Sequence, residues 1–130
     1  MVADLFHYGH VNFLRTAREH GDYLLVGIHS DEVVRNYKRA PILSMGERIA
    51  SVAGCRYVDE VVPDAPLTVT RAWIERHEID LVVHGDDFTE EQNEIYYETP
   101  IEMGIFRIVS YTPGISTSDI ITRCKAVDWD

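Results

Sequence analysis

Residues 23–28 read Tyr-Leu-Leu-Val-Gly-Ile, a short and continuous apolar run that follows a helical stretch ending at Gly21. A run of this kind is typical of a strand that is covered on both faces within a parallel sheet. The stretch before it, from Val11 to His20, carries apolar residues at helical spacing. A helix that leads directly into a doubly covered strand predicts an α/β fold.

Helical and extended patterns alternate outward from this stretch. We expect further strands over 58–62, 80–84 and 106–111, and helices over 44–54, 68–77, 90–104 and 117–126, the third of these broken or bent at Pro100. Strands alternating with helices imply βαβ units, a parallel sheet and right-handed crossovers. A length of 130 residues fits a single domain over 1–130.

The overall charge narrows the class of ligand. Lys and Arg number 12 and Asp and Glu number 22, which gives a net charge of −10. A surface this acidic repels a polyphosphate backbone, so general nucleic-acid binding is not expected, and a small anionic substrate needs the few cations gathered at one site.

Cysteines and hydropathy indicate the compartment. Cys55 and Cys124 are far apart and match no metal or redox spacing, so they are interpreted as reduced thiols of a cytoplasmic protein. No apolar run approaches the ~20 residues that span a bilayer, and we expect neither a signal peptide nor a membrane span.

Ligands of open α/β sheets bind beyond the carboxyl ends of the strands. Four segments are expected there: the residues before Val11, the loop 29–43, the turn 85–87 and the turn 114–117. Every candidate for chemistry falls in one of these four segments.

The first candidate is Asp4-Leu5-Phe6-His7-Tyr8-Gly9-His10. Two histidines three residues apart at a helix start project to the same side, and the free N–H groups and positive helix end there favour an anion. Such imidazoles can donate hydrogen bonds to oxygens that gain charge during phosphoryl-type transfer. Two alternatives remain: capping or surface histidines, and a zinc site, for which no third ligand is apparent.

The second candidate is Gly114-Ile115-Ser116-Thr117-Ser118-Asp119. Consecutive hydroxyl residues opening a helix supply donors for phosphate oxygens beside exposed backbone amides. The plainer interpretation is a helix cap, with Ser116 and Asp119 as a capping box, and the two roles are compatible.

Basic residues and one acidic pair complete the candidates. Lys38 and Arg39 lie in a mobile-looking loop, with Arg48 and Arg56 following, and together these cations could neutralise a triphosphate. Asp86-Asp87 after the strand 80–84 can accept from an amino group or hydroxyl, hold magnesium, or simply form a turn.

Three motifs taken in order carry a resemblance. Residues 4–10 resemble the HxGH signature of the nucleotidyltransferase superfamily. Residues 56–62, Arg-Tyr-Val-Asp-Glu-Val-Val, and 114–121, Gly-Ile-Ser-Thr-Ser-Asp-Ile-Ile, are similar to motifs of the cytidylyltransferases that make CDP-ethanolamine, CDP-choline and CDP-glycerol. The resemblance covers about residues 4 to 124. It implies a Rossmann-like doubly wound parallel sheet with helices on both faces.

The resemblance implies a reaction and a set of roles. The phosphate of a phosphorylated alcohol attacks the α-phosphorus of CTP, pyrophosphate leaves, and Mg²⁺ accompanies CTP; the family also forms homodimers, with the segment 56–61 near the subunit contact. Catalysis is then mostly positioning and charge stabilisation. The residues that the resemblance assigns are His7, His10 and Lys38 for catalysis, Asp4, Gly9, Arg56, Asp87, Gly114, Ile115, Ser116, Thr117 and Ser118 for the nucleotide, and Arg48 and Asp31 for the acceptor.

The sequence departs from the family pattern at three places. The apolar first strand that precedes HxGH in the family is missing, so we expect that the chain begins inside the domain or that another segment fills the gap. Tyr111 stands where the family commonly has Arg, which removes a phosphate-binding cation, and Arg107 or Arg123 are candidates to compensate. Leu67 stands where the choline enzymes carry Trp, which argues against a quaternary ammonium.

The expected function is therefore cytidylyl transfer from CTP, with phosphoethanolamine as the first acceptor considered. Residues 84–89 also resemble the ethanolamine enzymes. The alternatives are an adenylyltransferase that uses ATP, and a catalytically weak nucleotide-binding module that regulates a partner.

Overall fold

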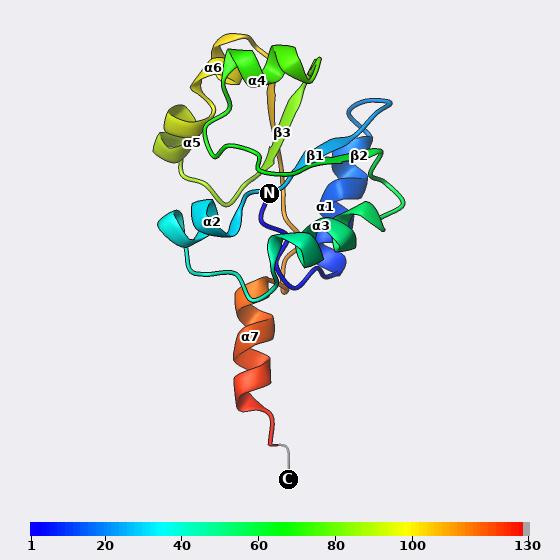
Figure 1. The fold of residues 1–130 in the computed structure, drawn as a ribbon, viewed down its shortest axis with the longest axis vertical. Helices are drawn as coiled ribbons and strands as arrows, with labels where there is room; N and C mark the ends of the chain where they lie inside the picture. The colour runs from blue at the N-terminus through cyan, green and yellow to red at the C-terminus, as the bar shows by residue number, and fades with distance from the viewer. Residues whose placement is uncertain (129–130) are drawn as a thin grey trace.

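The computed structural model describes residues 1–128, and helices and strands alternate along the chain (Figure 1). The helices are α1 (Tyr8–Arg18), α2 (Asp31–Tyr37), α3 (Met45–Ala53), α4 (Arg71–Arg76), α5 (Glu90–Tyr96), α6 (Glu98–Glu102) and α7 (Thr117–Ala126). The strands are β1 (Leu25–Gly27), β2 (Glu60–Val62), β3 (Val82–Gly85) and β4 (Phe106–Val109). This order confirms the α/β fold with parallel strands.

The strands form two separate parallel pairs. In the first pair Val26 of β1 lies opposite Val61 of β2, and in the second Val83 of β3 lies opposite Arg107 of β4. β1 and β3 are not hydrogen-bonded to each other. At the end of β1 the Met1 ammonium group donates to the Gly27 carbonyl, and the His29 N–H donates to the Met1 carbonyl at 3.1 Å. The described strands thus form two two-stranded sheets, with the chain start hydrogen-bonded to the end of β1.

The core lies between α1, α3 and the first strand pair. Leu14 of α1, Ile28 after β1 and Val52 of α3 are almost completely buried and belong to one apolar cluster. Each such side chain contributes about 1.5–3 kcal/mol when fully buried. This cluster fixes the start of α1 against the end of β1, and both of these line the candidate site.

Local capping sets where several helices begin. The Ser44 hydroxyl accepts from the Glu47 N–H while the Glu47 carboxylate accepts from the Ser44 N–H, which is the capping box that the sequence predicts. Thr70 and Thr89 cap α4 and α5 in the same way, through their hydroxyl oxygens.

Four expectations about elements need correction. The segment 29–43, expected as a loop, contains α2, because the Ser30 hydroxyl caps it by accepting from the Val33 N–H at 3.2 Å. The expected helix 90–104 is two helices that meet at Tyr97, whose backbone is non-helical, while Pro100 lies inside α6.

The other two corrections concern helix starts. α1 begins at Tyr8, three residues earlier than expected, because its cap is the His7 side chain. α4 begins at Arg71 rather than residue 68, because its cap is Thr70.

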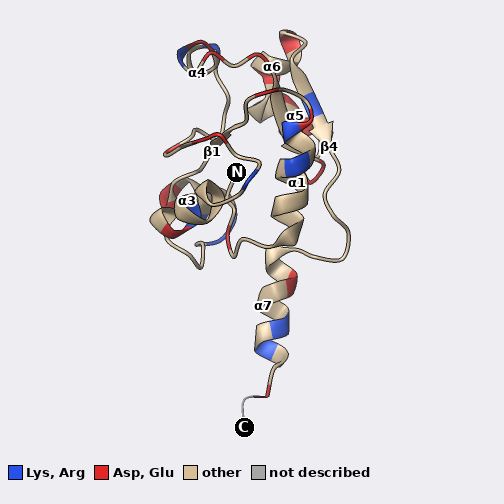
Figure 2. Ribbon diagram, turned by 90° about the vertical axis from the view of Figure 1, so that its right-hand side faces the viewer, with Lys and Arg blue, Asp and Glu red and all other residues tan. Residues whose placement is uncertain are grey.

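Helix α7 projects from the rest of the molecule (Figures 1 and 2). Its first turn carries Asp119 and its last turn Arg123 and Lys125, an arrangement that complements the helix dipole. Within residues 1–128, no helix has the length and apolar character needed to cross a membrane.

Candidate functional site

A cavity of about 680 Å³ lies at the carboxyl ends of the strands and extends between the two strand pairs. Its wall is shared by the start of α1, the end of β1, α2 and the residues after it, the β3–α5 turn and the start of α7. Its volume is in the range of small-molecule sites. The topology therefore brings all four segments that the sequence singled out to one hollow.

His7 and His10 are held in one tautomer by the helix start. The Gly9 N–H donates to Nδ1 of His7 at 3.1 Å, and the His7 N–H donates to Nδ1 of His10 at 3.0 Å. Because each Nδ1 accepts a hydrogen bond, the proton of each neutral ring is on Nε2. The two rings, with centroids 3.9 Å apart, thus present a pair of Nε2–H donors. Both histidines cap the helix start through Nδ1, which leaves the Nε2–H group of each ring available to a ligand.

Burial keeps both rings neutral. It lowers the pKa of His10 to about 4, with the neighbouring His7 adding to the effect. Burial also lowers the pKa of His7. At neutral pH the pair therefore offers neutral donors, which become more favourable as negative charge develops on a bound oxygen.

Gly9 is required by packing at this helix start. A Cβ at this position would lie 2.9 Å from Cε1 of His7 and 3.1 Å from Cγ2 of Ile115. The His7 ring could not then fold back over the first turn. Gly9 thus acts through the conformation of His7 and through its own N–H.

Asp4 organises the backbone around the histidines. It is buried, and its carboxylate accepts from the N–H groups of Ile42 at 2.8 Å and Leu43 at 2.9 Å. Its neighbours Ala3 and Leu5 have positive φ angles of 56° and 48°, a strained conformation for residues with a Cβ. The Asp4 carboxylate therefore holds the segment 39–43 against the histidine loop, and it lines the cavity from this position.

The hydroxyl residues at the start of α7 have three different roles. Ser116 caps the helix by accepting from the Asp119 N–H at 3.0 Å, and Thr117 donates to the Asp4 carbonyl at 2.7 Å. The Ser118 hydroxyl has no partner among the residues that the structure describes. All three line the cavity, together with Ile115. Ser118 and the first-turn amides are thus the unused donors here.

Two cations reach the cavity from the segment after α2. Lys38 is exposed, and its ammonium group lies 5.5 Å from the centre of the Tyr37 ring. Arg39 lies 3.6 Å from the Asp4 carboxylate. Within the described chain no carboxylate pairs with Lys38, so its charge is free to meet an anion.

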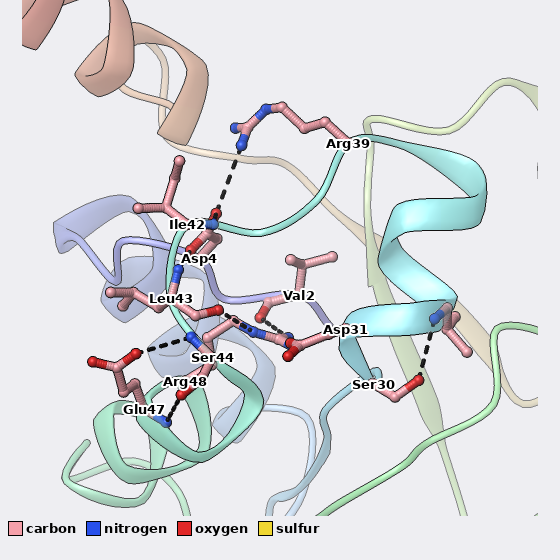
Figure 3. A network of polar contacts seen from close by, with 11 residues as sticks. Val2, Asp4, Ser30, Asp31, Arg39, Ile42, Leu43, Ser44, Glu47 and Arg48 are labelled. Atoms are coloured by element: carbon pink, nitrogen blue, oxygen red, sulfur yellow. Dashed lines mark hydrogen bonds and ion pairs between the residues drawn. The ribbon is translucent and has the colours of Figure 1, made fainter.

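Arg48 and Asp31, both expected to bind the acceptor, bind each other instead (Figure 3). The Arg48 side chain is completely buried; it donates to the Asp31 carboxylate at 2.7 Å, the Val2 carbonyl at 2.8 Å and the Leu43 carbonyl at 3.3 Å. Neither residue lines the cavity. Their position therefore favours a structural role, fastening the chain start, α2 and the segment before α3 together.

Of the remaining predicted residues, one lines the cavity and two lie outside its wall. Asp87 lines the cavity, and its carboxylate lies 3.9 Å from Nδ1 of His84. Arg56 is exposed and does not line the cavity. Gly114 shapes the turn before α7, where its φ of 82° suits glycine, and it also lies outside the wall.

The structure adds wall residues that the sequence did not single out as ligands: His29, Tyr37, His84, Phe88 and Tyr111; Tyr97 lines the cavity as well. Burial is the main reason that the pKa of Tyr37 is raised to about 12 and that those of Tyr97 and Tyr111 are raised as well. Tyr111 packs against Phe13 and over Gly85, where a Cβ would collide with its ring. In the sequence His29 directly follows the apolar run 23–28, and His84 ends the expected strand 80–84; these positions are the signal that could have found them.

The site thus combines paired imidazole donors, a helix N-terminus with hydroxyls and an unpaired lysine in one cavity. A family model described as Cytidylyltransferase-like matches residues 2–123. The chain belongs to the cytidylyltransferase-like family. The fold brings His7, Gly9 and His10 and residues 115–118 to the wall of the same cavity.

Individual relatives agree with the family assignment. The chain is 50% identical to an ethanolamine-phosphate cytidylyltransferase of Arabidopsis thaliana, over 95% of this chain and 31% of the relative. It is 46% identical to the ethanolamine-phosphate enzyme of Dictyostelium discoideum, over 92% and 35%. It is 42% identical to choline-phosphate cytidylyltransferase A of Homo sapiens, over 94% and 34%. The chain therefore spans about a third of the length of these relatives.

A solved structure supports the fold. The lipopolysaccharide core biosynthesis protein of Thermoplasma volcanium superposes with a TM-score of 0.68, at 24% identity, over 86% of this chain and 91% of that one. At this identity the likeness concerns the fold alone, and it is consistent with the Rossmann-like fold that the sequence predicts.

Proposed function

We propose that this protein transfers the cytidylyl group of CTP to phosphoethanolamine, giving CDP-ethanolamine and pyrophosphate. An oxygen of the acceptor phosphate attacks the α-phosphorus of CTP, and the bond from that phosphorus to the pyrophosphate oxygen breaks. No covalent enzyme intermediate is required, so the protein acts by positioning and charge stabilisation.

The observation that carries this proposal is the convergence of anion-binding groups in one cavity. The Nε2–H groups of His7 and His10 face a wall that also holds Ser118 and the start of α7. Donors fixed before the reaction stabilise charge that develops on the phosphate oxygens without any cost of reorganisation. Lys38, which lines another part of the same cavity, would contact the triphosphate from there.

Magnesium is expected to enter with the nucleotide. It would neutralise part of the charge that builds on the departing pyrophosphate. Residues 1–128 bring no three histidine, cysteine or carboxylate side chains together, and the Asp4 carboxylate is already used by backbone N–H groups. The donor set therefore fits an ion held mostly by phosphate oxygens.

The acceptor is proposed from the relatives and from the wall. The relatives at 50% and 46% identity are ethanolamine-phosphate enzymes. Asp87 and the rings of Tyr37 and Tyr97 supply a carboxylate and aromatic faces, which suit an ammonium group.

The test is incubation of the purified chain with CTP, Mg²⁺ and a panel of phosphorylated alcohols, with pyrophosphate release as the readout. We expect release to be fastest with phosphoethanolamine, and faster with CTP than with ATP. Absence of release with every acceptor would contradict the proposal, and preferential use of ATP would support the adenylyltransferase alternative. Tight binding of CTP without turnover would support the regulatory module.

We further propose that the protein acts as a homodimer in the cytoplasm. Arg56 and Glu60, in the segment that the resemblance places near the subunit contact, are exposed. Cys55 and Cys124 are unpaired, which suits a reducing compartment. Light scattering should give a particle of twice 14.9 kDa; a monomer at micromolar concentration would contradict the dimer.

A further inference from the structure

His29 follows β1, in the part of the cavity wall where the chain enters α2. Only 7% of its surface is exposed. It lies outside both the HxGH and the GISTS motif. The reaction proposed above assigns no role to His29.

The tautomer of His29 is opposite to that of His7 and His10. Its Nδ1 lies 2.8 Å from the Ala65 carbonyl oxygen. A carbonyl oxygen can only accept, so Nδ1 must carry the proton. In the neutral ring, Nε2 is then a hydrogen-bond acceptor.

The Nε2 atom of His29 has no protein partner in the described part of the chain. It is not closed off from solvent, because the side-chain polar atom there that is both closed off and unpartnered is Oδ1 of Asn93. Since His29 lines the cavity, a ligand in the cavity can reach Nε2. A buried acceptor of this kind is costly to leave unpaired when a ligand excludes water.

The residues around His29 suit a ligand that carries both a positive and a negative charge. The Tyr37 ring meets it edge-on at 6.3 Å between centroids, and the Asp87 charge acts on both Tyr37 and His84. The Lys38 ammonium group lies 5.5 Å from the centre of the same Tyr37 ring. Burial, with the nearby N-terminal ammonium group, lowers the pKa of His29 to about 3, so the ring stays neutral at any pH at which the protein would be assayed.

We propose that Nε2 of His29 accepts a hydrogen bond from the ammonium group of the phospho-amino alcohol, and thereby selects a head group with N–H donors over a fully methylated one. This inference rests on the proposed function, since it concerns the acceptor side of the same cavity. Asp87 and Tyr37 attract any cation, whereas an imidazole acceptor distinguishes cations by their donors. His29 is thus a specificity-determining residue.

A series of substrates tests this without any mutation. Phosphoethanolamine and its mono-, di- and trimethylated forms carry three, two, one and no N–H donors on nitrogen. We expect KM to rise most at the last step, where the final donor is lost, by about tenfold to a hundredfold. An even rise at every step would indicate that size alone is sensed and would overturn the inference.

Two variants separate hydrogen bonding from structure. His29→Asn places an amide N–H where Nδ1 donates to Ala65, and it removes the acceptor at Nε2. We expect the KM for phosphoethanolamine to rise about ten times more than that for phosphocholine, with kcat changing less than KM. His29→Gln returns an acceptor oxygen close to the Nε2 position and should restore part of the preference.

His20→Asn is the matched control, since His20 is exposed at the end of α1 and bonds only the Thr16 carbonyl. It should leave the ratio of the two KM values unchanged. A ratio that is equally unchanged in His29→Asn would overturn the inference.

The failure of this inference can be told apart from the failure of the proposed function. Turnover tests the function, whereas titration calorimetry of phosphoethanolamine and phosphocholine with the protein alone tests the selectivity. No turnover in the wild type counts against the function. A calorimetric preference for phosphoethanolamine that His29→Asn does not reduce counts against the role of His29.

Discussion

Two regions of this molecule hold donor groups of the same kinds and use them differently. Around Arg48 every direction of the guanidinium is occupied by protein: Asp31, Val2 and Leu43. Around His7, His10 and Lys38 the donors point into a cavity without protein partners in the described chain. Residue type alone therefore does not define a ligand-binding group. A group can bind a ligand when it lies at a cavity and has hydrogen-bonding capacity that the protein does not use.

The largest effect is expected when Arg48 is removed, because this tests whether its contacts are structural. Arg48→Ala leaves the Val2 and Leu43 carbonyls without their donor, and we expect a loss of about 3–5 kcal/mol in the free energy of unfolding. Denaturant unfolding measures it, and Arg71→Ala, at an exposed position, is the control. Unchanged stability with a raised KM for the acceptor would instead make Arg48 a ligand residue.

The converse change affects activity. His10→Asn keeps an acceptor for the His7 N–H but removes the Nε2–H donor, so the cap survives and the catalytic contact does not. We expect turnover to fall by about 10²–10³-fold, with stability nearly unchanged. Steady-state kinetics with CTP check this, and turnover within a factor of two of wild type would refute the role given to His10.

Asp4 joins the two regions, so its variant should affect both. In Asp4→Asn the amide still has one acceptor oxygen, but it loses the charge that holds the Ile42 and Leu43 N–H groups. We expect a loss of about 1–3 kcal/mol in unfolding free energy together with a smaller fall in turnover. Differential scanning calorimetry beside kinetics tests the pairing; loss of turnover with full stability would make Asp4 a direct ligand.

The smallest expected effect is a pH dependence of stability. The native pKa of His10 is about 4 and that of His29 about 3, both below the ordinary 6.5. The unfolded chain therefore binds more protons, and the stability that these residues contribute is present above about pH 6.5 and is lost as the pH falls below it. Between pH 6.5 and 5 the unfolding free energy of His10→Asn should fall less steeply than that of wild type. Parallel curves would show that His10 is not held neutral.

Local contacts shape the parts of the candidate site that lie within the predicted motifs. The tautomers of His7 and His10 are set by N–H groups within three residues, and the caps of α3 and α7 are equally local. The helix α2 was missed because its only strong local signal is Ser30 before an acidic first turn. The division of 90–104 into two helices was placed at the wrong residue, because proline is tolerated in the first turn of a helix.

The sequence alone predicted the alternation of helices and strands and the resemblance to the family, because periodicity, capping and motif spacing act over a few residues. The long-range contacts of the folded chain decide which of the candidate groups keep unused hydrogen-bonding capacity. Asp31, at the start of α2, and Arg48 are seventeen residues apart, and their bond consumes both. His29 and Ala65 are thirty-six residues apart, and their bond makes an ordinary buried histidine an acceptor. Contacts between residues that are distant in sequence use the donors and acceptors of these side chains, and the fold determines which of those contacts form.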